Sequence, residues 1–211
     1  MVSKRWEAVH VAIAGLLAAC APQGAASTTT ASSTASAAPA SAAAEMGSLQ
    51  KTCDGGKLAD CVELGRLYAR DSGGAENTAK AAALFQKACD GNEMRGCTEL
   101  GLLYALGHGV GKDAAKATAL LQKACDGGHM TTCTTLGMLY RLGNRVPQDL
   151  AKAAALFQKA CDGGHMDGCV QLGLLYAEGE GVTKDAAKAR ALFQKACDGG
   201  EPRACSAAQA P

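Results

Sequence analysis

Residues 152–176 read KAAALFQKACDGGHMDGCVQLGLLY, and this stretch decides the fold. Its first part, KAAALFQKAC at 152–161, and its last part, CVQLGLLY at 169–176, recur along the chain every 36 residues without gaps. Further copies stand at 80–89, 116–125 and 188–197, and at 61–68, 97–104 and 133–140. A fixed period of this length indicates a repeat architecture, in which each unit is one supersecondary motif.

Both parts of the repeat carry apolar residues at helical spacing. Cys97, Leu100 and Tyr104 stand at positions i, i+3 and i+7, and the stretch from Ala81 to Ala88 follows the same pattern. This spacing predicts one apolar stripe on each of two helices. A single helix–loop–helix unit cannot bury its own stripe, whereas stacked units can. By analogy with other helix-pair repeats, the chain is predicted to be all-α, a right-handed α-solenoid of four units.

Glycines and polar residues mark where the predicted helices pack and end. A glycine inside a helix costs about 1 kcal/mol relative to alanine, so its recurrence predicts a contact too close for a Cβ atom. That glycine stands at positions 65, 101, 137 and 173. The predicted N-caps of the second helices are Asn77, Asp113, Asp149 and Asp185. An Asp-Gly-Gly sequence should end the second helices.

The domain boundaries follow from this register. The repeat domain is expected at 45–211, with a front cap from Met46 to Cys53. The four repeats are predicted at about 53–88, 89–124, 125–160 and 161–196, and the C-terminal cap at 197–209.

The N-terminus has the features of an export signal. Lys4 and Arg5 precede an apolar run at 11–19 that is too short to span a bilayer, so residues 1–19 are predicted to be a signal peptide. Leu17 to Cys20 resembles the bacterial lipobox, which predicts lipidation of Cys20; a plain cleaved signal is the alternative. Residues 20–44 are predicted to be the lipidated cysteine and a disordered Ala/Ser/Thr tether.

These features predict a location in the bacterial cell envelope. The lipid anchor would hold the chain facing the periplasm or at the cell surface, and it would be the only contact with the membrane. Ala21, where an Asp would favour retention in the inner membrane of some bacteria, favours the outer membrane.

Composition and charge exclude some functions. Only 4% of the residues are aromatic, which favours thin layers of closely packed helices over a wide core. Without residues 1–19, 19 basic and 19 acidic residues remain, so the chain lacks the basic excess of a nucleic-acid-binding protein. Eleven cysteines are unusual for a reduced cytosolic enzyme unless they bind metal.

The repeats resemble the Sel1-like repeat family, relatives of the tetratricopeptide repeat. The resemblance covers about residues 53–205 and rests on L-G-x-L-Y, then G-x-G-V-x-x-D, then K-A. Repeat 1 departs from it with the loop RDSGGAEN, and repeat 3 has Arg145 in place of the second loop glycine, so both loops are expected to differ in shape.

The cysteine pattern is similar to that of the Helicobacter cysteine-rich proteins, which are secreted and have one disulfide per repeat. Every pair is spaced C-x7-C across a turn between helices, where the two residues can approach within bonding distance. The predicted pairs are Cys53–Cys61, Cys89–Cys97, Cys125–Cys133, Cys161–Cys169 and Cys197–Cys205. A metal site that adds His129 or His165 is the alternative, but three of the five pairs lack this histidine. No metal and no cofactor is therefore predicted.

The same resemblance implies the main alternative function, because members of that group have been described as β-lactamases or penicillin-binding proteins. Ser48-Leu49-Gln50-Lys51 matches the S-x-x-K motif of such enzymes, although no S-D-N and no K-T-G accompanies it. His108, His129 and His165 lie in predicted turns, where we expect them to be solvated. No catalytic residue is assigned, and a weak β-lactamase or a cell-wall-fragment binder remains the alternative.

A binding surface is predicted on the first helices, because these positions vary while their neighbours repeat. The face would consist of Arg66, Leu102, Met138, Leu174, Glu63, Glu99, Thr135 and Gln171. Packing against the adjacent repeat is the alternative role for these residues. The sequence thus favours a monomeric scaffold that binds a protein or peptide of the cell envelope, and not nucleic acid.

Overall fold

The computed structural model describes residues 38–70, 74–143 and 145–209, and it has ten helices along this part of the chain. Their bounds are α1 (Ala38–Asp54), α2 (Leu58–Arg70), α3 (Gly74–Asp90), α4 (Met94–Leu106), α5 (Ala114–Asp126), α6 (Met130–Leu142), α7 (Leu150–Asp162), α8 (Met166–Glu178), α9 (Ala186–Asp198) and α10 (Pro202–Ala208). The described residues contain no strand. The predicted all-α class is confirmed.

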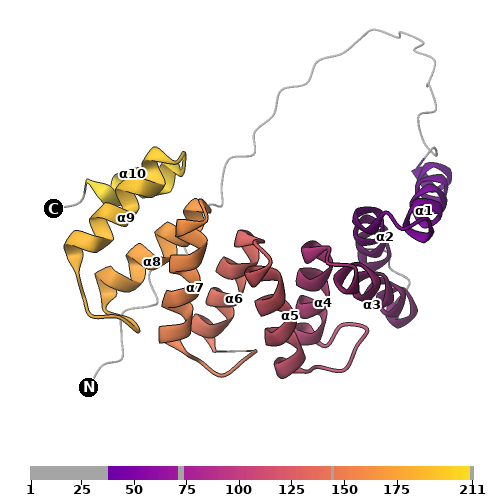
Figure 1. Cartoon of the computed structure of the whole chain (residues 1–211), viewed down its shortest axis with the longest axis horizontal. Helices are drawn as coiled ribbons and strands as arrows, with labels where there is room; N and C mark the ends of the chain where they lie inside the picture. The colour runs from indigo at the N-terminus through magenta and orange to yellow at the C-terminus, as the bar shows by residue number, and fades with distance from the viewer. Residues whose placement is uncertain (1–37, 71–73, 144, 210–211) are drawn as a thin grey trace, which may run out of the picture. The chain divides into compact units, whose positions relative to one another are not determined.

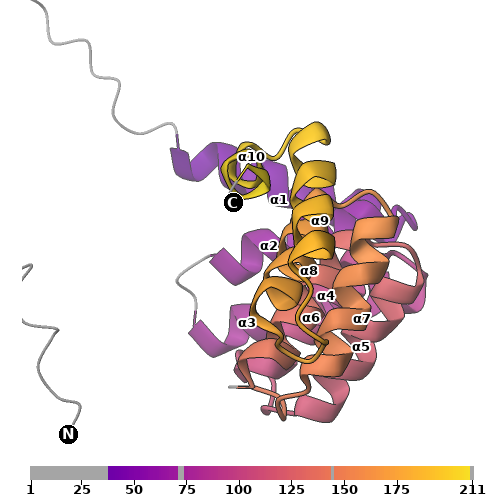
Figure 2. The ribbon, with the colours of Figure 1, turned by 90° about the vertical axis from the view of Figure 1, so that its left-hand side faces the viewer.

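The helices pack in chain order. Each first helix (α2, α4, α6, α8) contacts the second helix of its own repeat, and that second helix contacts the first helix of the next repeat. Figure 1 shows the resulting row of helix pairs, and the view along the row superposes α4, α6 and α8 with α5 and α7 beside them (Figure 2). This stacking is the predicted solenoid.

The recurring glycine allows the two helices of a repeat to approach each other closely. A Cβ atom on Gly65 would lie 2.5 Å from the ring of Phe85, and one on Gly137 would lie 2.6 Å from the ring of Phe157. Gly101 faces the smaller Leu121, where the same distance would be 2.8 Å. The glycines therefore admit the few large side chains of the core, as predicted.

Three of the four predicted N-caps are present. The carboxylates of Asp113, Asp149 and Asp185 each accept a hydrogen bond, 2.9 Å long, from the backbone N–H three residues later. Asn77 is not a cap, because α3 begins earlier, at Gly74. The loop of repeat 1 lacks the G-x-G-V sequence, and Gly74 turns the chain with a φ of 67°.

All five predicted disulfides are present. Each joins cysteines eight positions apart across the turn between repeats, with Cα–Cα distances of 4.5–4.8 Å. The turn needs a residue with positive φ, which Gly56, Asn92 and Gly128 provide at the first three junctions. The cysteines of the first four bonds are buried, whereas Cys197 and Cys205 are half-buried.

Two capping helices close the array. Helix α1 packs on α2, and α10 packs on α9, where Ala204 and Ala208 are buried against Phe193. Helix α1 begins at Ala38, so the last part of the range predicted as a tether, 38–44, is helical; its alanines favour a helix. The predicted signal peptide, Cys20 and residues 21–37 lie outside the described residues. Along the described helices, none is both long and apolar enough to cross a bilayer.

Candidate functional site

The eight residues predicted to bind a partner all lie on first helices, and all are half-buried. Two come from each of the four helices. They are Glu63 and Arg66 on α2, Glu99 and Leu102 on α4, Thr135 and Met138 on α6, and Gln171 and Leu174 on α8. The surroundings of these residues differ from repeat to repeat, so the surface is not uniform.

On α2 and α4 the positions form a network of ion pairs. Arg66 Nη2 lies 2.7 Å from Glu99 Oε1 in the next repeat, and Arg66 Nη1 lies 3.1 Å from Glu63 Oε1. Arg95 adds a longer contact of 3.4 Å to Glu63. Burial alone would lower the pKa of Arg66, but its hydrogen bond to Glu99 and the two carboxylate charges raise it. The charges here are matched within the protein, so this end of the face joins repeats 1 and 2.

Further along, the apolar positions contact core clusters of their own and of neighbouring repeats. Leu102 packs against the cluster that contains Leu121 and Leu136, and Leu174 packs against the one that contains Phe193. Met138 packs against the cluster of Phe157 and its neighbours. These three contacts correspond to the packing role that the sequence left open. The binding role of the face stays a prediction.

Met138 and Thr135 also line a groove between α6 and the start of α8. Its volume is about 300 Å³. Met138, Leu139 and Leu142 give it an apolar floor. The polar rim consists of Thr131, Thr134, Thr135, His165 and Asp167. The groove therefore brings two residues of the predicted face to an open cavity.

Leu142 is the most exposed large apolar side chain of the described residues, at 59%. The equivalent position at the end of α2 is Arg70, and at the end of α8 it is Glu178. Leu106, at the end of α4, is exposed at 38%. Leu142 was not among the residues predicted to bind a partner, although a leucine where two other repeats carry a charged residue is a signal visible in the sequence.

The prediction that all three histidines are solvated is wrong for two of them. His129 and His165 are half-buried at the N-cap positions of α6 and α8. His165 Nδ1 lies 3.0 Å from the hydroxyl of Thr134, and His129 Nδ1 forms a short hydrogen bond with Thr132. Burial lowers the pKa of His129, and the positive charge of Arg95 lowers it further. His108, the third, is exposed.

The described residues contain no cluster of three or more His, Cys, Asp or Glu side chains that could hold a metal ion. In the metal alternative, the cysteines on either side of His129 and His165 would be ligands. They are instead bonded to each other. A thiolate site with these residues would require that both bonds be reduced.

Ser48 and Lys51 lie one turn apart on α1, and both are exposed. Neither lines the groove between α6 and α8. The β-lactamase hypothesis therefore rests on the family resemblance alone.

Four copies of the Sel1 repeat model match the chain, at 59–93, 95–129, 133–165 and 167–201. These matches cover well over half of the sequence. The chain belongs to the Sel1 repeat family. Proteins of this family act generally as scaffolds that bind other proteins. No curated protein matches the chain.

Solved Sel1 repeat structures are similar to this one. Cysteine-rich protein B of Helicobacter pylori shares 34% identity at a TM-score of 0.50, over 65% of this chain and 99% of that protein. A protective antigen of uropathogenic Escherichia coli shares 30% identity at a TM-score of 0.66, over 76% of this chain. A Sel1 repeat protein of Oxalobacter formigenes shares 27% identity at a TM-score of 0.65, over 75% of this chain.

The chain spans only part of two of these relatives. It covers 34% of the E. coli antigen and 65% of the Oxalobacter protein. The Helicobacter protein, by contrast, is matched along almost its whole length.

Proposed function

We propose that this Sel1 repeat protein is an exported, lipid-anchored scaffold that binds a protein or peptide partner in the bacterial cell envelope through the groove between α6 and α8. The observation that carries the binding part is the exposed Leu142 beside the apolar floor of Met138 and Leu139. A groove with an apolar floor and a polar rim suits an apolar side chain of a partner, while the rim can bond to its backbone.

Export and anchoring are supported by two independent features. Residues 1–20 have the layout of a lipoprotein signal, with Cys20 as the lipidated residue. The remaining ten cysteines form five disulfides, and such bonds persist in oxidising compartments such as the periplasm. Ala21 favours the outer membrane, and we expect a monomer that faces the periplasm or the cell surface.

Membrane fractionation tests the anchor. The full chain should enter the membrane fraction and carry the added mass of a lipid on its N-terminal peptide. Cys20→Ser should abolish both. A full chain that stays in the soluble fraction without added lipid mass would overturn the anchoring part of the proposal.

Site-specific photo-crosslinking in intact cells tests the groove. A photoreactive amino acid at position 142 should give a defined adduct with one envelope protein, and Met138→Glu should abolish that adduct. The matched control is the same amino acid at Ala83, an exposed position on α3. Equal adducts at 83 and 142, or an adduct that survives Met138→Glu, would contradict the proposal.

A chromogenic β-lactam tests the alternative inherited from the resemblance. We expect no turnover by the purified full chain. Turnover that is abolished by Ser48→Ala would replace the scaffold proposal with a hydrolase. The Lys51→Met variant provides a second check, because the S-x-x-K motif requires both residues.

A further inference from the structure

The loops of repeats 2 and 4 pack tightly on the preceding repeat. Gly109 and Gly181 have φ values of 68° and 69°, in the left-handed region that favours glycine. A Cβ atom on Gly109 would lie 2.4 Å from Thr78, and one on Gly181 would lie 2.5 Å from Leu150. These two loops therefore leave no space against the start of the preceding second helix.

Repeat 3 is built differently at the same place. The residue equivalent to Gly109 and Gly181 is Arg145, and its φ is not positive. The residue equivalent to Thr78 and Leu150 is Ala114. The side chain of Arg145 on the loop and the short side chain of Ala114 on the helix therefore prevent the close contact that repeats 2 and 4 make.

A cavity of about 430 Å³ lies at this junction. Tyr140 at the end of α6, with Val146 and Pro147 of the loop, forms one apolar part of its wall, and the start of α5 forms the other. The full lining is Ala114, Ala115, Thr118, Tyr140, Val146, Pro147, Gln148, Asp149 and Lys152. The volume falls within the range of about 300–1,000 Å³ that is typical of ligand pockets.

The acidic groups beside this cavity are already engaged. Asp149 accepts a hydrogen bond of 2.9 Å from the backbone of Lys152 and pairs with its Nζ at 3.1 Å. Asp113, directly before Ala114, caps α5 and lies 3.8 Å from Lys116 Nζ. Neither carboxylate is left unpaired.

Two cations flank the same residues without an acidic partner. Lys112 stands two positions before Ala114, and Arg145 directly precedes Val146. Within the described ranges, neither forms an ion pair with a carboxylate. Neither cation is among the residues that line the cavity, but the uncompensated charges that adjoin its lining in the sequence are positive, which favours an anionic ligand.

We propose that this cavity is a second binding site, which takes one apolar side chain of an acidic peptide while Arg145 and Lys112 contact its carboxylates. A guanidinium group is well suited to this role because it can bind a carboxylate with two parallel hydrogen bonds. The site uses α5, α6 and the loop of repeat 3, and it shares no lining residue with the groove between α6 and α8. The two binding proposals can therefore be tested independently of each other.

An NMR titration of the ¹⁵N-labelled full chain with Cys20→Ser tests the site. The probe is a capped peptide of one leucine flanked by glutamates, and the matched probe replaces the glutamates with lysines. The acidic peptide should shift the amide signals of Ala114, Ala115 and Val146, with an affinity at least about tenfold above that of the basic peptide. No shift at these residues would overturn the proposal.

Two variants test the charge and the space of the site separately. Arg145→Gly restores the residue of repeats 2 and 4, and Ala114→Leu introduces the residue of position 150. Each should weaken binding of the acidic peptide about tenfold or more, since one removes a cation and the other fills the space. Repeats 2 and 4 already carry glycine at this position, so the Arg145→Gly variant should remain folded. It tests the proposal even if Ala114→Leu disturbs α5.

Two controls separate this site from general charge and from the proposed groove. Lys184→Met removes an exposed cation from the equivalent loop of repeat 4 and should leave peptide affinity unchanged. Met138→Glu should also leave it unchanged, because Met138 lines only the other groove. Equal loss of affinity with Lys184→Met and Arg145→Gly would indicate non-specific attraction and would contradict the proposal.

Discussion

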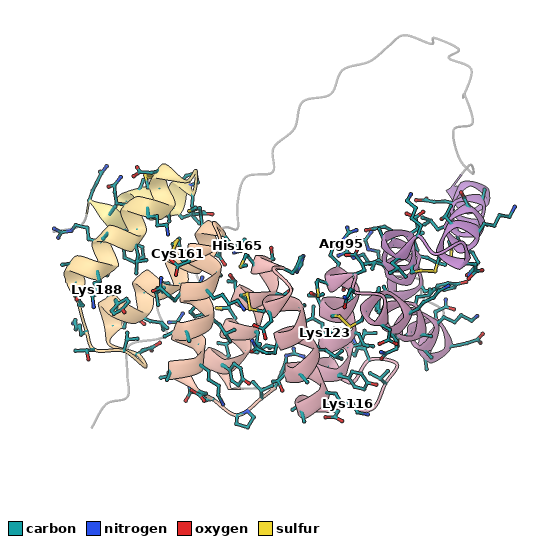
Figure 3. The ribbon with its side chains drawn as sticks, in the orientation of Figure 1. Arg95, Lys116, Lys123, Cys161, His165 and Lys188 are labelled. Atoms are coloured by element: carbon teal, nitrogen blue, oxygen red, sulfur yellow. A yellow bond between two sulfur atoms is a disulfide. The ribbon has the colours of Figure 1, made fainter. Side chains whose placement is uncertain are left out.

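The Nζ atom of Lys123 lies 2.9 Å from the carbonyl oxygen of Cys89, at the end of the second helix of the preceding repeat. The same contact joins Lys87 to Cys53 and Lys195 to Cys161. Figure 3 labels Lys123 on α5 and Cys161 at the end of α7, which belong to two different contacts of this series. Because the last carbonyl groups of a helix carry partial negative charge, each lysine stabilises the helix end of the repeat before it.

Lys123→Met should therefore lower the free energy of unfolding by about 0.5–1 kcal/mol, since it removes the cation and keeps the aliphatic stem. Urea unfolding with the disulfides intact measures the change. Lys112→Met, at a cation without an acidic partner, is the matched control and should be neutral within about 0.5 kcal/mol. Equal effects of the two variants would contradict this role for Lys123.

Gly137→Ala should destabilise the protein, although alanine is the better helix former. The new Cβ atom would meet the ring of Phe157 at 2.6 Å, and overpacking of this kind costs about 1–3 kcal/mol. Gly47→Ala on α1 is the matched control, because no atom lies within 4 Å of its Cβ position. It should be neutral or stabilising by up to about 1 kcal/mol.

A second change checks the cause of the Gly137 effect. Phe157→Leu reproduces the pair of Gly101 and Leu121 in repeat 2, with a smaller side chain opposite the glycine. In this background Gly137→Ala should cost less than in the wild-type chain. A cost that stays the same would show that the ring of Phe157 is not responsible.

The Cys197–Cys205 disulfide should be the first to react with a dithiol reductant, because its two cysteines are half-buried while the other eight are at most 1% exposed. Alkylation at increasing dithiothreitol concentration, followed by peptide mass mapping, measures the order. Modification should appear first at Cys197 and Cys205. Earlier modification at Cys125 or Cys133 would contradict the prediction.

His129 should make stability dependent on pH. Its lowered pKa means that the unfolded chain binds a proton more readily than the folded chain below about pH 6.5. Its contribution to stability is therefore present above that pH and is lost as the pH falls through the folded pKa. Urea unfolding between about pH 5 and 8 should show this loss.

His129→Glu, which introduces the residue of the equivalent position 93, should remove this part of the pH dependence. Glu93 itself accepts a hydrogen bond from the backbone of Arg95 at the start of α4, so the replacement has a precedent in the fold. An unchanged slope between pH 5 and 7 would show that His129 is not the group concerned.

Most of the fold could be predicted from the sequence because its signals are local and repeated. The apolar spacing, the caps at Asp113, Asp149 and Asp185, and the cysteine pairs each depend on residues within one turn or one helix pair. Gly137 could be interpreted without knowing its partner, because its recurrence alone indicated a close contact. Asn77 failed as a cap because the loop before it does not follow the repeat pattern.

The surface was less predictable because it depends on residues from different repeats. The cavity beside α5 is lined by Ala114 and Val146, which lie 32 positions apart, so the irregular loop at Arg145 could be noted in the sequence while the cavity could not. His129 is close to Thr98 of the preceding repeat as well as to Thr132. In Figure 3, Arg95 and His165 lie on the upper side of the ribbon and Lys116 lies on the lower side.

The disulfides also bear on how the chain matures. Cys53 and Cys61 are eight positions apart, whereas Cys61 and the next cysteine, Cys89, are 28 apart. If the chain crosses a membrane from its N-terminus, each correct pair of repeat cysteines is therefore exposed before the next pair arrives. Oxidation in order of emergence yields the native pattern without reshuffling, and whole units can be gained or lost over evolution without disturbing the remaining bonds.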